Sequence, residues 1–158
     1  MFLPKFSSRT TFTRGGFTLV ELMIVVGLVS ILSAIAVPNF QEMRLRSQRT
    51  EIPTNLSAIL TAERAYFHEF DTYTSVTVQP RADGDLDTKT SNWTGGYADW
   101  NALGFRLDEK LRGNYVVDGK NILFTATAKC DVDDDDTLAT YVGNQSSEPR
   151  LASANNIY

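Results

Sequence analysis

The chain is organised around residues 16–37, which read Gly-Phe-Thr-Leu-Val-Glu-Leu-Met-Ile-Val-Val-Gly-Leu-Val-Ser-Ile-Leu-Ser-Ala-Ile-Ala-Val. From Phe17 to Val37 there are 21 residues, and only Glu21 is charged. At about 1.5 Å of rise per residue, an α-helix of this length spans roughly 31 Å, which matches the hydrocarbon thickness of a bilayer. The pattern therefore predicts a transmembrane helix.

The single charge inside the apolar run requires an explanation. A charge near the centre of a membrane helix costs about 2.5–3.5 kcal/mol, and less near its end, so Glu21 should have a partner. The run is preceded by a basic leader, residues 1–16, that contains no acid. An ordinary secretory signal is cut after its apolar region, whereas the small-residue junction Gly15-Gly16 precedes this one. Cleavage after Gly16 would keep the apolar helix and create a new α-amine on Phe17.

Residues 16–26, followed by Ile35-Ala36-Val37-Pro38-Asn39-Phe40, resemble the N-terminal region of type IV prepilins. The resemblance implies that a prepilin peptidase cuts after Gly16 and methylates the amine of Phe17. It also implies that Glu21 meets the Phe17 amine of a neighbouring subunit during assembly. The two positions lie one turn apart on the same helix face. Pairing of Glu21 with the amine of its own chain is the local alternative.

The resemblance implies an α+β fold, the type IV pilin fold, in which a small antiparallel sheet packs on a long kinked N-terminal helix. Trp100–Phe105 and Gly113–Val117 are similar to the approach to the first strand in delta-proteobacterial-type pilins of the type IVa family. Kinks are expected at Gly27, Pro38 and Pro53, because glycine and proline are poor helix formers. The expected segments are a cleaved cytoplasmic leader (1–16), a transmembrane and assembly helix (17–37), its amphipathic continuation (38–70), a connecting loop (71–103), and a sheet with an acidic turn and a C-terminal tail (104–158).

Periodicity predicts the elements beyond the membrane segment. Alternating apolar residues predict strands at 113–117, 122–128 and 137–142, with a turn at Asp118-Gly119 and a loose tail from Gly143 onward. Apolar residues at helical spacing predict a helix that ends near residue 70 and buries one stripe. The stripe comprises Ile52, Leu56, Ile59, Leu60, Phe67 and Phe70.

Several single residues carry expectations of their own. The lone cysteine, Cys130, excludes the C-terminal disulfide found in many type IV pilins. We expect its thiol to be buried, with an interchain disulfide or an attached group as the alternatives. Trp93 and Trp100 are expected to pin the connecting loop, with a ligand-binding site as the alternative. Three arginines follow the apolar run: Arg44, Arg46 and Arg49. We expect them on a solvated helix face, or in contact with lipid headgroups or acids of adjacent subunits.

Residues 131–136 contain five carboxylates among six residues. Asp131, Asp133 and Asp135 alternate, as in loops that surround Ca²⁺ with hard oxygen ligands. The segment is no EF-hand, because Asp136 occupies the glycine position and Val142 replaces the closing glutamate. It resembles a loop of related pilins and pseudopilins, some of which bind calcium. Two interpretations stay open at this stage, a Ca²⁺ site and a solvated acidic turn.

Charge and composition narrow the classes of function. The 158 residues include 15 basic and 19 acidic ones, and removal of residues 1–16 would leave 12 against 19, a net charge of −7. An acidic surface disfavours nucleic-acid binding, and the basic leader favours a cytoplasmic N-terminus. His68 is the only histidine and is expected at the surface. No Ser/His/Asp set, Cys/His metal cluster or phosphate-binding glycine loop is present, so no enzyme is expected.

The resemblance implies a structural subunit of a type IV pilus, a filament for motility or adhesion. The precursor would be a single-pass protein of the bacterial inner membrane, surrounded by lipid, and the processed subunit would polymerise into an extracellular filament. Implied partners are identical or related pilin subunits, the prepilin peptidase/methyltransferase and an inner-membrane assembly platform. A type II secretion pseudopilin and a minor tip pilin that acts as a binding module are the alternatives.

Overall fold

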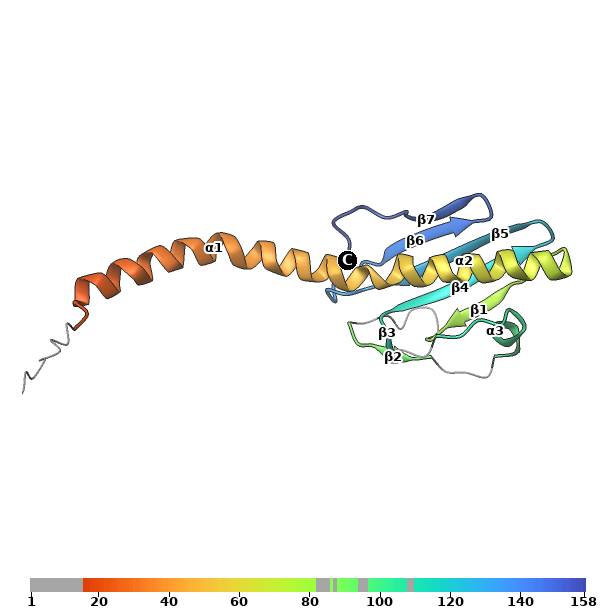
Figure 1. Cartoon of the computed structure of the whole chain (residues 1–158), viewed down its shortest axis with the longest axis horizontal. Coiled ribbons are helices and arrows are strands. Elements are labelled where there is room, and N and C mark those ends of the chain that lie inside the picture. Colours follow the sequence, from red (N-terminus) through yellow and green to blue (C-terminus); the bar gives the residue numbers. More distant parts are fainter. Residues whose placement is uncertain (1–15, 82–85, 87, 94–96, 108–109) are drawn as a thin grey trace, which may run out of the picture. The chain divides into compact units, whose positions relative to one another are not determined.

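The computed structural model describes residues 16–81, 86, 88–93, 97–107 and 110–158. The predicted leader up to Gly15 lies outside the described residues. The chain divides into two compact units, which meet between Phe40 and Gln41. Each unit is described below by itself, and Figure 1 labels the elements.

The N-terminal unit is a single apolar helix, the first part of α1 (Leu19–Arg49). α1 continues through Gly27 and Pro38, and the kinks expected there stay predictions. Together with α2 (Glu51–Phe70), it contains a stretch long and apolar enough to cross a membrane, with a mean hydropathy of 2.5 and no buried residue in that window. The α+β class is confirmed by this helix and the sheet that follows.

The boundary between α1 and α2 has a local cause. Pro53 has no N–H, so the carbonyl of Arg49, four residues earlier, loses its helical donor. Thr50 forms a turn there, and its N–H donates to the carbonyl of Ser47 at 3.2 Å, a spacing of three residues. Pro53 then lies in the first turn of α2, where a proline is tolerated. The kink expected at Pro53 itself stays a prediction.

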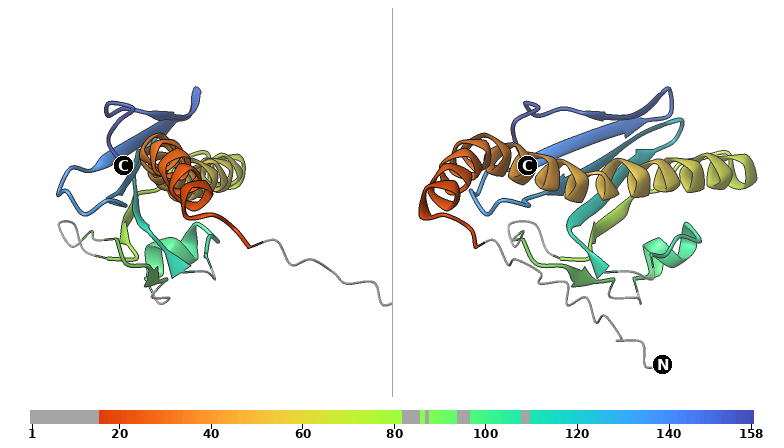
Figure 2. Two further views of the ribbon diagram at one scale, coloured as in Figure 1. Left: turned by 90° about the vertical axis from the view of Figure 1, so that its left-hand side faces the viewer. Right: turned by 60° about the vertical axis from the view of Figure 1, so that its left-hand side comes forward.

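The second unit contains a five-stranded antiparallel sheet in the order β1-β4-β5-β6-β7. α2 lies along one face of this sheet, as Figures 1 and 2 show. A second, two-stranded sheet pairs β2 with β3, and a short helix, α3, lies between them in the chain. The bounds are β1 (Val76–Gln79), β2 (Ser91–Asn92), α3 (Ala98–Ala102), β3 (Lys110–Leu111), β4 (Gly113–Lys120), β5 (Leu123–Cys130), β6 (Ala139–Asn144) and β7 (Ser147–Leu151).

The three predicted strands correspond to β4, β5 and β6, but the turn predicted at Asp118-Gly119 is wrong. β4 continues to Lys120, which pairs with Leu123, and the turn is Asn121-Ile122. Asn121 has a φ of 54°, a conformation that asparagine tolerates well. Gly119 lies inside the strand because of a close approach, since a Cβ there would lie 2.2 Å from the carbonyl oxygen of Thr74.

The core lies between α2 and the sheet. α2 buries Ile52, Leu56, Ile59 and Leu60 as predicted, but the stripe continues with Glu63, a residue that the apolar pattern missed. Phe70, predicted in the stripe, is 53% exposed. It is the last residue of the helix, and Asp71 then leaves it through the left-handed conformation, so the final turn is not covered.

Candidate functional site

The N-terminus of α1 is closed by a capping box formed by Thr18 and Glu21. A Glu21 carboxylate oxygen accepts the N–H of Thr18 at 2.9 Å and its hydroxyl at 2.8 Å, while the N–H of Glu21 donates to the Thr18 hydroxyl at 3.2 Å. Such a reciprocal pair satisfies donors that no helical carbonyl reaches, and the cap contributes about 1 kcal/mol. The only acid of the apolar run therefore has partners within its own chain. The Thr-x-x-Glu spacing could have predicted them.

The side chains around this box are not covered by any part of the chain that the structure describes. Phe17 is 86% exposed and precedes the first helical residue, Leu19. The large apolar side chains of the helix up to Val37 are each at least 51% exposed. Soluble monomeric proteins rarely expose an apolar surface of this extent. The segment therefore requires an apolar environment, either lipid or other protein helices.

Comparison with known proteins now assigns this segment. Residues 12–37 match the family model described as the prokaryotic N-terminal methylation motif. The N-terminal region is therefore similar to that of type IV prepilins. In this chain the motif contains the capping box and the exposed apolar helix, and the α+β architecture is consistent with the type IV pilin fold.

The curated relatives share only part of their length with this chain. It is 53% identical to the type IV major pilin protein PilA of Myxococcus xanthus over 58 residues, 37% of this chain and 26% of the relative. It is 51% identical to a fimbrial protein of Pseudomonas aeruginosa over 47 residues, 30% of each chain. It is 46% identical to the type IV major alpha-pilin of Moraxella bovis over 54 residues, 34% of each chain. The matches thus span about a quarter to a third of these relatives.

The C-terminal tail, predicted to be loose, is instead held by a buried arginine. Arg49 is 6% exposed, and its guanidinium donates to the carbonyls of Ile157 and Asn155 and to the Asn155 side chain. The same guanidinium lies over the Tyr158 ring, 4.9 Å from its centroid. A cation over an aromatic face is attracted by the ring, more strongly when water is excluded. The sequence placed Arg49 on a solvated helix face. The structure instead buries it, and it anchors the tail.

Tyr158 completes this C-terminal closure. Its hydroxyl accepts a hydrogen bond from Nε of Arg46 at 3.2 Å and donates one to Glu42 at 3.0 Å. The Tyr158 hydroxyl and Arg46 together lower the pKa of the Glu42 carboxyl. The Tyr158 carbonyl also accepts the N–H of Val132, which ties the tail to the acidic turn. Aromatic and charged contacts thus close the tail in a chain whose one cysteine cannot form an internal disulfide.

Cys130 is buried, as predicted. It lies at the end of β5 with no exposed surface, and burial raises the pKa of its thiol to about 12. The thiolate is the reactive form of cysteine, so this residue is inert in the folded chain. An interchain disulfide through Cys130 would require the sheet to open.

The acidic turn is organised by Asp131, which is 1% exposed. Its two carboxylate oxygens accept the N–H groups of Asp134 at 2.8 Å and Asp136 at 3.2 Å. Asp133 and Asp135 are exposed, and the pKa of Asp133 is raised by burial and by its acidic neighbours.

Oxygen atoms of Asp131, Asp133 and Asp135 lie within 4.8 Å of one another, which suits the first shell of Ca²⁺. Calcium takes six to eight oxygens, and these residues would supply three of them. The backbone hydrogen bonds account for Asp131 without any metal. The calcium interpretation stays a prediction.

The tryptophans of the connecting loop pack on the sheet. Trp100 is 2% exposed, and its indole N–H donates to the carbonyl of Thr77 at 2.7 Å. Trp93 meets the Trp100 ring edge to face at 4.8 Å. These contacts support the predicted pinning role, and the burial of Trp100 leaves it no ring face for a ligand.

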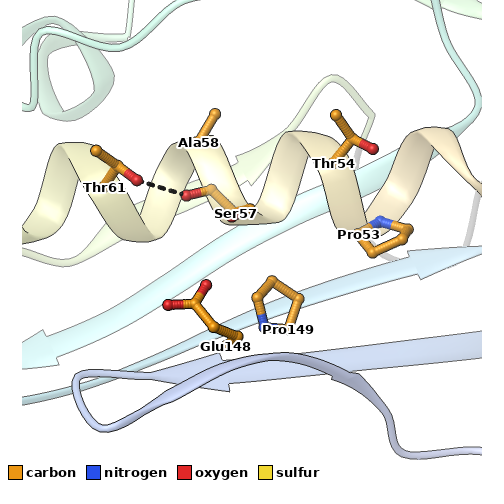
Figure 3. A pocket seen from close by; sticks show the side chains of 7 residues that line it. All are labelled: Pro53, Thr54, Ser57, Ala58, Thr61, Glu148 and Pro149. Atoms are coloured by element: carbon orange, nitrogen blue, oxygen red, sulfur yellow. Dashed lines mark hydrogen bonds between the residues drawn. The ribbon is translucent and has the colours of Figure 1, made fainter.

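A groove of about 540 Å³ lies between α2 and β7 and is shown in Figure 3. The hydroxyls of Thr54 and Thr61 donate to helix carbonyls four residues earlier, so they turn away from any ligand. Glu148, its only carboxylate, pairs with Arg64 at 3.1 Å. The groove therefore holds no nucleophile with an adjacent base. Its lining comprises Pro53, Thr54, Ser57, Ala58, Thr61, Glu148 and Pro149.

Proposed function

We propose that this chain is the structural subunit of a type IV pilus, stored in the inner membrane and polymerised through its N-terminal helix. The observation that carries the proposal is an uncovered apolar helix that begins within a methylation motif. The helix has two environments in this scheme. Lipid covers it in the precursor, and the helices of other subunits cover it in the filament.

Processing after Gly16 would act directly on the capping box. It would free and methylate the amine of Phe17, the residue before Thr18. In the stored subunit, the Thr18 donors satisfy Glu21. In the filament, the cationic amine of a neighbouring subunit would pair with that carboxylate and set the axial register. A carboxylate among apolar helices is tolerated when a cation and hydrogen-bond donors meet it.

The remaining parts of the proposal follow from this scheme. Polymerisation needs the prepilin peptidase/methyltransferase and an assembly platform in the membrane, and the product is extracellular. The relatives named above are major pilins and fimbrial proteins, which supports a pilus subunit over a secretion pseudopilin. The proposed role is structural and not catalytic, in keeping with the pilin and fimbrial names of these relatives.

Mass spectrometry of the purified native protein tests the proposal. Intact mass and N-terminal fragmentation should show Phe17 as the first residue, carrying one methyl group. Shearing of cells should release the same species as the filament protein. A working form that retains residues 1–16, or that is trimmed beyond Val37, would contradict the proposal.

A further inference from the structure

Glu63 is a buried carboxyl group with an incomplete set of partners. It has no exposed surface, and it continues the buried stripe of α2 one turn beyond Leu60. One carboxyl oxygen accepts the N–H of Thr74 at 3.2 Å. The other oxygen has no hydrogen-bond partner among the described residues. Buried polar atoms are nearly always hydrogen-bonded, so this oxygen marks a feature that the fold alone does not require.

The partner of Glu63 lies in the link that connects α2 to β1, residues 71–75. This link has further attachments along its length, among them the Thr72 hydroxyl, which donates to the carbonyl of Asn121 at 3.4 Å. The N–H of Asp71 donates to the carbonyl of Phe67 at 2.9 Å, and that of Tyr73 to the carbonyl of Asn121 at 2.8 Å. The Ser75 hydroxyl donates to the Gly119 carbonyl at 2.8 Å and accepts the Gly119 N–H at 3.0 Å.

The central position of the link depends on Glu63. Thr74 lies against Gly119, and any side chain at position 119 would collide with the Thr74 carbonyl. The N–H of Thr74 is directed to the Glu63 carboxyl. β1, which follows the link, is an edge strand that pairs on one side only, with β4. Opening of the link would therefore leave the pairing of β4, β5 and β6 intact.

We propose that Glu63 is a proton-controlled latch on the link between α2 and β1. The link is closed while the carboxyl is neutral and opens to water when the carboxyl loses its proton. Charge on a buried group without a second donor is costly, and exposure to water removes that cost. The latch operates within one chain and does not depend on the proposed assembly.

Burial raises the pKa of Glu63 from 4.5 to about 7, and the Thr74 N–H opposes that shift. No charged side chain contributes to the shift, so the proton responds to solvent pH and not to a salt-bridge partner. α2 packs on β5, β6 and β7. The ionisable residues of these strands and of the link are Lys129, Cys130, Tyr141, Glu148, Arg150, Asp71 and Tyr73.

The direction of the pH dependence follows from these two values. Below about pH 4.5 both the open and the closed link hold the proton, and pH has no effect. Between 4.5 and about 7 the open link loses its proton first, so closure weakens as pH rises. Above about pH 7 the closing equilibrium no longer changes with pH. It is then about 300-fold weaker than below pH 4.5, because the pKa values of Glu63 in the open and closed link are 4.5 and about 7.

Native-state amide exchange of the full chain in detergent, corrected for intrinsic rates, tests the latch between about pH 5 and pH 9. The protection of the Thr74 amide should fall by about 75-fold across this range, while β5 amides stay protected. In Glu63→Gln the protection of Thr74 should not change with pH. Glu69→Gln, an exposed site on the same helix, should behave as the wild-type chain.

Two results would overturn the proposal. One is Thr74 protection that is independent of pH in the wild-type chain. The other is an equal loss of protection in β5, which would show that Glu63 acts on global stability. Should Glu63→Gln fail to fold, the wild-type chain still decides the question through its Glu63 carboxyl ¹³C shift. Titration of that shift near pH 4.5 would reject the latch.

Discussion

The two units of this chain treat the same kinds of side chain in opposite ways. In the N-terminal unit, leucine, isoleucine and valine are at least half exposed along the whole helix up to Val37. In the second unit, Ile52, Leu56 and Ile59 have no exposed surface at all. Full burial of such a side chain contributes roughly 1.5–3 kcal/mol, a gain that the first unit does not obtain from its own chain.

Burial of an apolar helix therefore depends on whether its own chain provides a surface to pack on, and not on the helix itself. α2 is amphipathic and finds a sheet in its own chain, whereas the first part of α1 is apolar on all sides. A helix that is apolar all round requires a large protein core or a membrane. Substitutions in the first unit should therefore affect assembly, and those in the second unit should affect folding.

The largest expected effect is that of Glu21→Ala on assembly. In the proposed assembly the methylated amine of a neighbouring Phe17 would lose its partner, so we expect filament yield to fall to background. The subunit should remain in the membrane, because its apolar helix is more hydrophobic than before. Sheared-filament yield and membrane fractionation measure the two quantities.

Thr18→Ala is the matched control for this variant. It removes a cap contribution of about 1 kcal/mol but keeps the carboxylate, so it should reduce assembly without abolishing it. Normal filaments from Glu21→Ala would show that the acid serves only as a helix cap. Glu21 in the first unit would then have no role in assembly.

The second prediction compares one leucine from each unit. Leu56→Ala should lower the free energy of unfolding by about 2–5 kcal/mol, because it leaves a cavity between α2 and the sheet. Leu28→Ala, at a site that is 58% exposed, should change that free energy by less than about 0.5 kcal/mol and weaken the assembled filament instead. Chemical denaturation in detergent and filament disassembly measure the two effects. Equal destabilisation by both variants would refute the division of roles.

The third prediction concerns the arginine that closes the tail. Arg49→Ala should lower the free energy of unfolding by about 1.5–3 kcal/mol, since it leaves the carbonyls of Asn155 and Ile157 without their charged donor. Arg44→Ala, an exposed position on the same helix, should cost less than about 0.5 kcal/mol. Thermal melting and limited proteolysis of the tail report the difference. A tail equally resistant in both variants would remove Arg49 as its anchor.

Local patterns predicted much of this architecture from sequence. The apolar run, the buried residues from Ile52 to Leu60 and the three central strands follow from periodicity, because each pattern is contained in a short window. The Thr-x-x-Glu box is equally local, since Thr18 and Glu21 are three residues apart. The site residues of the processing motif were recognised by resemblance.

The features that sequence did not predict depend on contacts between distant residues. Arg49 and Tyr158 are 109 positions apart, and nothing in either local window indicates that they meet. Glu63 occupies a position on the buried stripe of α2, but its charge would assign it to the surface. Gly119 reads as a turn residue until Thr74 is known to lie against it. In each case the information lies in tertiary contact and not in composition.

The smallest expected effects separate two aspartates of the acidic turn in the second unit. Asp131→Ala should cost about 1–3 kcal/mol, because two backbone N–H groups lose their buried acceptor. Asp133→Ala should stay within about 0.5 kcal/mol of the wild-type chain in the presence of a chelator, since its carboxylate is exposed and repelled by its neighbours. Thermal melting with and without millimolar calcium measures both variants. A calcium-dependent rise in Tm that Asp133→Ala abolishes would assign a metal to this turn. The acidic turn of the second unit would then resemble the helix of the first unit, because both would require a partner from outside the chain.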